Sequence, residues 1–133
     1  MCSADLIGVR RMENRLTIGR AGEAIAVEYL RRKGLSLLAR NVHFGYCEID
    51  LVMESLQFCH IIEVKTLTGN NLVLPYERVD FQKRNNLFKA TRRLIRTYRI
   101  DKEIVFDIVS VVINEGKIYL KYIPDAFSPI NQI

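Results

Sequence analysis

The sequence predicts an α/β fold in which a central mixed β-sheet is flanked by helices. Two segments, residues 18–33 and 80–99, repeat apolar side chains at helical spacing. Five other segments alternate apolar and polar residues or form runs rich in Val and Ile, as strands do. The order is helix, three strands, helix, two strands. At 133 residues the chain is expected to form a single domain, 1–133.

The first helix is expected over residues 18–33, with Thr17 as its N-cap and Gly34 as its C-terminal stop. Its apolar stripe contains Ile18, Gly22, Ile25, Ala26, Tyr29 and Leu30. Glu23 lies at the edge of this stripe, so its carboxylate is directed toward the interior, where it could reach a metal ion. The alternative is that Glu23 only favours the positive end of the helix dipole. Residues 1–15 are left open between a flexible arm and a short helix.

Three strands follow, over residues 35–42, 46–53 and 58–66, with a turn at residues 43–45. In the second strand Cys47, Ile49, Leu51 and Met53 alternate with Glu48, Asp50 and Val52, so the two sets are expected on opposite faces. The third strand is nearly continuous in apolar residues, which is typical of a strand buried on both faces. Glu63 and Lys65 nevertheless interrupt it.

The second and third strands are close enough in sequence to form a hairpin. A turn centred between Leu56 and Gln57 places Asp50 directly opposite Glu63, whereas a turn centred two residues earlier places Asp50 opposite Cys59. Directly opposed side chains have Cβ atoms about 4.5 to 5.5 Å apart. Two ionised carboxylates at that distance require a proton or a cation between them.

Lys65 follows Glu63 on the same face of the strand, about 6.6 Å further along. A divalent ion that bridges the two acids, with an ammonium group beside it, can activate water and neutralise a phosphate. The alternative is an ion-paired edge hairpin in which Lys65 only neutralises the acids. Both interpretations are open at this point.

The second helix is expected to begin after Asp80 and to run to about Arg99, with an apolar stripe of Leu87, Phe88, Thr91, Leu94, Ile95 and Tyr98. Its other face carries Lys89, Arg92, Arg93, Arg96 and Arg99. No acid alternates with these cations, so they cannot offset one another through i,i+4 pairs, and they could contact phosphates. A merely solvated face is the alternative. Lys83 flanks the apolar stripe and could point to the same cleft as Lys65.

The remaining segments complete the expected sheet. Residues 67–78 are predicted as an extended loop, residues 104–113 and 117–123 as strands, and residues 114–116 as the turn between them. Asp107 interrupts the first of these strands and is expected to pair with an arginine or to cap the sheet edge. The tail is expected to pack over an edge through Phe127 and to fray over residues 128–133.

Composition limits the class of protein. The formal net charge is +5 and the pI is near 9.3, which favours polyanionic partners. No apolar run is long enough to span a bilayer, and no secretory signal is recognisable, so we expect a cytoplasmic protein with no membrane partner. The alternation places Cys47 and Cys59 on opposite faces, which argues against a disulfide between them. Together with His43 and His60, they lack the usual ligand spacing of a zinc site.

A set of residues in order resembles a known family. The set comprises Gly22, Glu23, Gly34, Asn41, Glu48-Ile49-Asp50, Ile62-Glu63-Val64-Lys65, Lys83, Phe106-Asp107 and Ile123-Pro124-Asp125-Ala126-Phe127. It resembles the YraN-like family, a group of bacterial proteins predicted to have the PD-(D/E)xK restriction-endonuclease-like fold and similar to archaeal Holliday junction resolvases. The resemblance extends over about residues 17–127. The chain departs from the family at Cys47, where glycine is usual, and at Val105, where arginine is usual.

The resemblance implies roles for particular residues. Asp50 and Glu63 would be metal ligands, Lys65 the lysine of the signature, Glu23 the helix glutamate that approaches the metal, and Lys83 a basic residue beside the site. The superfamily uses Mg²⁺ or Mn²⁺ to cleave phosphodiester bonds. Resolvase-like enzymes act as dimers, so the resemblance also implies a homodimer.

Three functions from different classes remain. The first is a Mg²⁺-dependent endonuclease acting on DNA, with branched or otherwise structured DNA as the class of substrate. The second is a nucleic-acid-binding protein with a nuclease-like fold and no catalysis. The third is an interaction protein whose basic surface contacts a protein or a membrane, which predicts no salt-dependent DNA binding.

Overall fold

The structure, a computed structural model, describes residues 10–69 and 80–129, with side chains described from residue 17 onward. Its elements in order are α1 (Arg10–Arg32), β1 (Ser36–Phe44), β2 (Cys47–Glu54), β3 (Phe58–Thr68), α2 (Phe81–Tyr98), β4 (Glu103–Asn114) and β5 (Lys117–Phe127). The strands form one sheet in the order β1-β2-β3-β4-β5. Only the β3–β4 pair is parallel, so the sheet is mixed. The predicted α/β class is therefore confirmed, and the fold is compatible with that of a nuclease.

Helix α1 is longer than the sequence predicts. It includes Arg10, so Thr17 lies inside the helix and the N-cap prediction is wrong. Gly34 ends it as predicted, with φ at +99°. The Leu35 N–H bonds to the Leu30 carbonyl and the Gly34 N–H to the Arg31 carbonyl, each at 3.0 Å. This pair of bonds is a Schellman motif, which requires the left-handed conformation that glycine adopts most easily.

Helix α2 begins where the sequence predicts. The Asp80 side chain caps it by accepting a hydrogen bond from the Lys83 N–H at 2.8 Å. Arg99 ends it in the left-handed region, with φ at 51°. Among the residues described, no helix is both long and apolar enough to cross a bilayer.

The β2–β3 and β4–β5 hairpin turns are tight. In the β2–β3 turn the Ser55 N–H bonds to the Phe58 carbonyl at 3.0 Å, so the turn is centred between Leu56 and Gln57. In the β4–β5 turn, Glu115 and Gly116 have φ angles of 50° and 78°. Two consecutive positive φ angles match the twist of the flanking strands.

Strand β5 continues through Phe127, further than predicted, and residues 130–133 lie outside the described part of the chain. Of the predicted loop at 67–78, Leu67 and Thr68 belong to β3, and residues 70–79 also lie outside.

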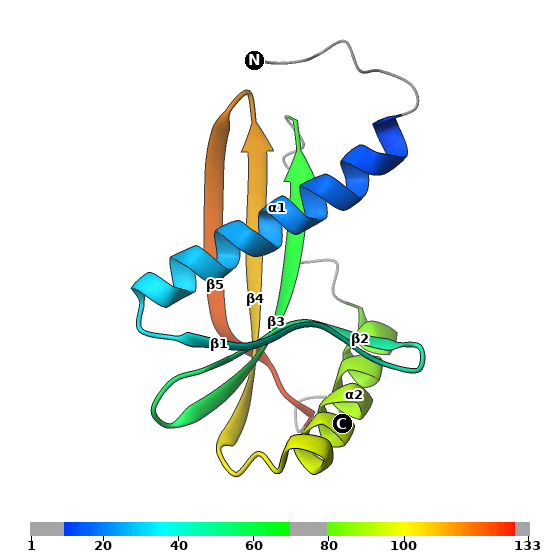
Figure 1. The fold of residues 1–133 in the computed structure, drawn as a ribbon, viewed down its shortest axis with the longest axis vertical. Helices are drawn as coiled ribbons and strands as arrows, with labels where there is room; N and C mark the ends of the chain where they lie inside the picture. The colour runs from blue at the N-terminus through cyan, green and yellow to red at the C-terminus, as the bar shows by residue number, and fades with distance from the viewer. Residues whose placement is uncertain (1–9, 70–79, 130–133) are drawn as a thin grey trace.

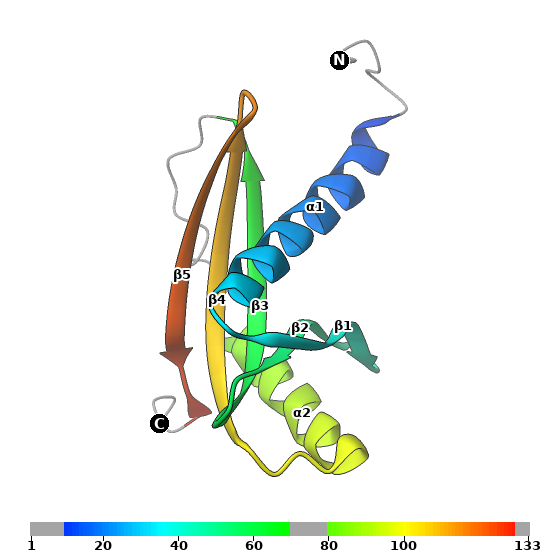
Figure 2. The same cartoon turned by 60° about the vertical axis from the view of Figure 1, so that its left-hand side comes forward.

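Two hydrophobic cores lie on either side of the sheet. The β1–β2 ribbon runs between α1 and α2 (Figure 1), and it keeps this position in the turned view (Figure 2). The core against α1 contains Ala26, Val27, Leu30, Leu51, Met53, Ile62, Val109 and Val111. The core against α2 contains Ile49, Val52, Cys59, Ile61, Leu87, Phe88, Ala90, Leu94, Phe106, Ile108 and Phe127.

Strand β2 changes face at Asp50, which the sequence did not predict. Ile49 packs in the core against α2, whereas Leu51 packs in the core against α1, although strict alternation would place both on one face. On the neighbouring strand, Asn41 has φ at 50° between the paired residues Arg40 and Val42. Left-handed backbone at this position interrupts the β1–β2 ladder opposite Asp50.

This irregularity corrects the reasoning about the cysteines. Cys59 is buried in the core against α2, and Cys47 packs against the same core, so the two thiols are not on opposite faces. Both are free. The expected absence of a bond between them therefore holds, but the face argument behind it was wrong.

Candidate active site

The site begins where β2 separates from β3. Of the two registers that the sequence left open, the β2–β3 pairing has the one with the turn between Leu56 and Gln57. It stops at Leu51 opposite Ile62, one position before Asp50 would meet Glu63. Beyond it, the Val64 N–H donates to Asp50 Oδ2 at 2.9 Å instead of to a strand carbonyl. The Asp50 carboxylate thus occupies the wedge between the two diverging strands.

A glycine brings the third carboxylate to this wedge. A Cβ on Gly22 would lie 1.9 Å from Thr66 Oγ1, so only glycine lets α1 approach β3 this closely. Glu23 is the next residue, and its Oε1 accepts a hydrogen bond from Asn41 Nδ2 at 3.2 Å. The close approach of α1 and the left-handed turn at Asn41 therefore position Glu23 together.

Two adjoining cavities share this region. One has a volume of about 400 Å³ and is lined by Ile18, Gly19, Glu23, Asp50, Glu63, Val64, Lys65, Thr66, Thr68 and Lys83. The other has a volume of about 380 Å³ and is lined by Tyr46, Glu48, Asp50, Glu63, Asp80, Gln82, Lys83, Asn86 and Leu87. Both share Asp50, Glu63 and Lys83. The structure thus brings together all five residues that the sequence placed at or beside the catalytic centre: Glu23, Asp50, Glu63, Lys65 and Lys83. Their roles stay predictions.

Glu63 is 3% exposed and is the most enclosed of the three acids that line the first cavity. Its Oε1 contacts Lys65 Nζ at 3.3 Å and also forms an ion pair with Lys83 Nζ. A buried carboxylate needs such partners, because an unpaired charge would be costly to bury. The two lysines come from different elements, β3 and the first turn of α2.

The surroundings raise the pKa values of the other two acids. Burial, followed by the Glu63 charge, raises the pKa of Asp50 to about 7, against the opposing Val64 hydrogen bond. Burial also raises the pKa of Glu23, and the hydrogen bond from Asn41 only partly opposes this. At these two positions negative charge is not fully compensated by the protein itself.

The pKa values of the two lysines are shifted in opposite directions. Burial, followed by the hydrogen bond to Lys83, lowers the pKa of Lys65. Burial alone would lower the pKa of Lys83 too, but the charge of Glu63 and hydrogen bonds to Glu63 and Lys65 outweigh it and raise that pKa. Neighbouring groups whose pKa values are driven apart can take different proton-transfer roles.

The three carboxylates offer a hard oxygen donor set of the kind that Mg²⁺ and Mn²⁺ prefer. They come from α1, β2 and β3 and line one cavity. Within residues 10–69 and 80–129, however, no three acidic, histidine or cysteine side chains are gathered closely enough to form a complete metal site. Glu63 instead contacts lysines. The donors therefore fit a divalent ion in type and in cavity, and coordination would require Glu63 to exchange a lysine for the ion.

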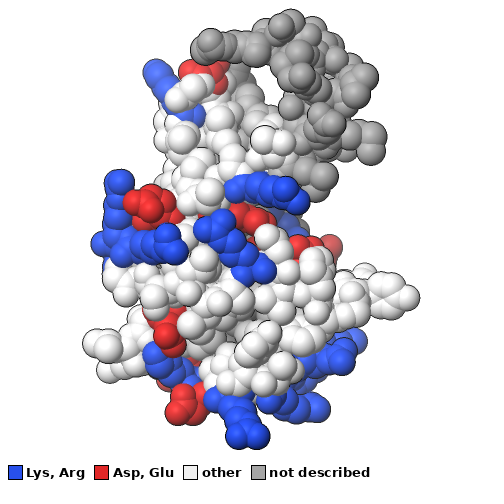
Figure 3. Space-filling model, viewed as in Figure 1, with Lys and Arg blue, Asp and Glu red and all other residues white. Residues whose placement is uncertain are grey.

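The predicted phosphate-contacting residues lie apart from the two cavities. Lys89, Arg92, Arg93, Arg96 and Arg99 are all exposed along α2. Lys and Arg side chains gather over α2 at the lower right of Figure 3. Arg93 also stacks on the hairpin, with its guanidinium carbon 5.5 Å from the Phe44 ring centroid. The basic face is thus fixed relative to the β1–β2 ribbon.

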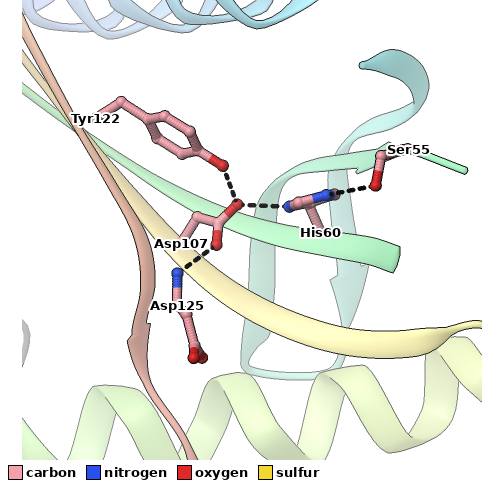
Figure 4. Close-up of polar contacts among 5 residues, drawn as sticks. All are labelled: Ser55, His60, Asp107, Tyr122 and Asp125. Atoms are coloured by element: carbon pink, nitrogen blue, oxygen red, sulfur yellow. Dashed lines mark hydrogen bonds and ion pairs between the residues drawn. The ribbon is translucent and has the colours of Figure 1, made fainter. Parts of the chain in front are cut away.

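A second polar cluster surrounds Asp107, which the sequence predicted to pair with an arginine or to cap an edge. The predicted pairing with an arginine is wrong. Asp107 Oδ2 contacts His60 Nδ1 and accepts a hydrogen bond from the Tyr122 hydroxyl, both at 2.7 Å (Figure 4). Its Oδ1 accepts from the Asp125 N–H at 2.8 Å, which anchors the end of the edge strand β5. The bulge at Phe106/Ile108 in the β4–β5 ladder lies at the same position.

The cluster continues to Ser55, whose Oγ lies 3.0 Å from His60 Nε2. Ser55, His60 and Asp107 are thus in the order of contacts of a hydrolytic triad. His60 is only 8% exposed, however, and the Ser55 N–H that an oxyanion hole would use is bonded to Phe58. We therefore assign the cluster a structural role, tying the β2–β3 turn to β4 and β5.

Sequence reasoning did not assign roles to several residues at the site. Asn41 holds Glu23, and Tyr46, Glu48, Gln82 and Asn86 line the cavity toward α2. Gln82 and Asn86 share a helix face with the predicted cations, which was a usable signal. The position of Asn41 depends on its backbone conformation, and no sequence pattern indicates that.

Comparison with known proteins identifies the family of the chain. The sequence profile of the uncharacterised protein family UPF0102 matches residues 22–111. The chain belongs to this family. UPF0102 is the YraN-like group that the sequence motifs resemble, and the matched region contains all five clustered residues and the whole of α2.

Relatives in UPF0102 match most of the chain. A UPF0102 protein of Syntrophomonas wolfei is 40% identical over 111 residues, covering 83% of this chain and 96% of the relative. One of Porphyromonas gingivalis is 38% identical over 96 residues, covering 72% and 71%. One of Dictyoglomus turgidum is 32% identical over 117 residues, covering 86% and 99%. The family is thus established, and its activity is a matter for proposal.

Proposed function

We propose that this UPF0102 protein is a metal-dependent endonuclease that hydrolyses phosphodiester bonds in DNA. The observation that carries the proposal is the convergence of Glu23, Asp50 and Glu63 from three elements on one cavity beside two lysines. The raised pKa of Asp50, at about 7, supports it, because uncompensated carboxylates are where a divalent cation binds most favourably.

The residues of the chain have distinct tasks in this proposal. Lys65, whose pKa is lowered by burial, accepts the proton of the attacking water, because a lysine with a depressed pKa releases its own proton more readily and becomes available as a base. Lys83, whose pKa is raised, remains charged and holds a non-bridging oxygen of the scissile phosphate. The exposed cations of α2 position the DNA backbone.

Asp50, Glu63 and Glu23 would hold the Mg²⁺ or Mn²⁺ ion. When bound, the ion supplies charge neutralisation at the phosphate and a lowered pKa for a coordinated water. Asn41 orients Glu23 toward that position. The homodimer implied by the resolvase resemblance stays a prediction.

A second candidate is a DNA-binding protein without catalysis. The specific observation that favours it is the pairing of Glu63 with both Lys65 and Lys83, which already compensates the acid most central to a metal site. In this alternative the basic face of α2 binds DNA and the carboxylates remain bonded to lysines.

One experiment separates the two. Purified protein is incubated with Mg²⁺ or Mn²⁺ and linear duplex, single-stranded or four-way-junction DNA, alongside Asp50→Ala and the matched control Glu115→Ala in the exposed β4–β5 turn. The nuclease proposal expects cleavage that Asp50→Ala abolishes and Glu115→Ala retains. Absence of cleavage, or cleavage unchanged in Asp50→Ala, would refute it. DNA binding that persists without cleavage would support the second candidate.

A further inference from the structure

Tyr46 stands out on the surface of the site. It occupies the two-residue turn between Phe44 and Cys47 and is fully exposed, at 104% relative exposure. Gly45 supplies the positive φ of 64° that the turn requires. The fold therefore needs nothing from the ring of Tyr46, which nonetheless lines the cavity that contains Asp50 and Glu63.

The cavity beside Tyr46 has the chemistry of a site for a neutral polar ring. Its volume of about 380 Å³ lies within the range of small-molecule sites. Glu48, Asp80, Gln82 and Asn86 line it with carboxylate and amide groups. Carboxylates repel a phosphate, but they and the amides accept hydrogen bonds from exocyclic amino groups of bases, and amides also donate to ring nitrogens.

A helix stripe connects this cavity to the basic face. Gln82, Asn86, Lys89, Arg93 and Arg96 follow one another at intervals of four, three, four and three residues, so they lie along one side of α2. The stripe changes from amides at the cavity to cations beyond it. A DNA strand whose phosphates contact the cations would bring its next nucleotide to the amides and to Tyr46.

We propose that Tyr46, Gln82 and Asn86 form a subsite for an unpaired nucleobase, which stacks on the Tyr46 ring while the adjoining phosphate lies at Glu23, Asp50 and Glu63. The inference rests on the proposed nuclease function and names its substrate class: DNA with an unstacked nucleotide next to the scissile bond. A base within a continuous duplex is stacked on both sides and cannot present its face to Tyr46. Aromatic side chains bind single-stranded bases in this way without sequence preference.

The test measures binding in buffer containing Ca²⁺ in place of Mg²⁺ or Mn²⁺, because Ca²⁺ takes the same oxygen ligands, and gel electrophoresis checks that both duplexes remain intact. Two fluorescent duplexes are compared, one fully paired and one carrying a single unpaired 2-aminopurine, whose fluorescence is quenched by stacking. Tyr46→Ala is expected to weaken binding of the bulged duplex about tenfold and to remove the quenching. It is expected to change binding of the paired duplex by less than twofold. Tyr46→Phe should retain both properties, and the matched control Tyr119→Ala, on the exposed face of β5, should leave both unchanged.

The possible results separate failure of the nucleobase subsite from failure of the nuclease proposal. Equal weakening on both duplexes, or none on either, would overturn the subsite. If the wild-type protein cleaves DNA in an Asp50-dependent manner but Tyr46→Ala does not selectively weaken binding of the bulged duplex, this inference fails and the nuclease proposal stands. If the wild-type protein binds neither duplex, both fail.

Discussion

Replacing Asp50 with asparagine tests the electrostatics of the site without relying on catalysis. Asparagine has the same shape and can still accept the Val64 N–H bond, but it carries no charge. Burial and the Glu63 charge raise the pKa of Asp50 from 3.8 to about 7. A carboxyl whose pKa is raised by folding costs the native state progressively more as pH rises from the unfolded to the folded pKa.

The magnitude follows from about three pKa units at roughly 1.4 kcal/mol each, an upper limit of about 4 kcal/mol above pH 7. Integrating between the two pKa values, we expect Asp50→Asn to be more stable than the wild type, with an advantage that grows by roughly 2–3 kcal/mol from pH 5 to pH 8. Loss of function and gain of stability would thus coincide, as is common at active sites.

The assay is urea denaturation of both proteins at pH 5 and pH 8, with and without Mn²⁺. The ion should stabilise the wild type at pH 8 by neutralising the carboxylates and should have a much smaller effect on Asp50→Asn, because one ligand charge is lost. A stability difference that is the same at both pH values would show that the Asp50 carboxylate is compensated, and would refute the reasoning. Equal Mn²⁺ stabilisation of both proteins would place any metal elsewhere.

Three further predictions concern the scaffold and the basic face. Gly22→Ala inserts a Cβ 1.9 Å from β3 and should cost about 1–3 kcal/mol in urea denaturation, whereas Gly19→Ala in the same helix has free space and should not destabilise. Tyr122→Phe removes one bond to the fully buried Asp107 and should lower the free energy of unfolding by about 1 kcal/mol, with a cooperative transition retained. Arg96→Ala should reduce the slope of log affinity for duplex DNA against log salt by about one, and an unchanged slope would place the phosphates elsewhere.

The sequence predicted the elements that depend on local pattern. The turn between Leu56 and Gln57 was one of two alternatives, and its position brings Asp50 to the end of the ladder beside Glu63, although the two residues are not paired. The cap at Asp80 and the stop at Gly34 were predicted because each depends on a single residue type at a helix end. The α/β class followed from the order of such elements.

The remaining features depend on contacts between distant segments. The change of face at Asp50 lies opposite the left-handed Asn41 on the neighbouring strand, and period-two reasoning within one strand takes no account of a neighbouring strand. The partners of Asp107 come from β3 and β5, so a short-range view suggested an arginine instead of His60 and Tyr122. The N-cap prediction at Thr17 was wrong because α1 extends back to Arg10, and residues 10–16 have no clear apolar stripe in the sequence that would indicate a helix.

The pKa directions bear on whether the acids belong to a structural ion-pair network or to a functional site. A network built for stability favours the ionised form of its carboxylates and lowers their pKa values. Here the nearby lysines pair with Glu63, while Asp50 and Glu23 both have raised pKa values, burial being the largest cause for each. The protein has therefore buried two acids beside a third and formed lysine ion pairs with only the third. The charges of Lys83 and Arg40 oppose the raised pKa values of Asp50 and Glu23 without cancelling them. Such an arrangement costs stability that a purely structural hairpin could avoid by replacing Asp50, which supports the proposal that the site binds a cation.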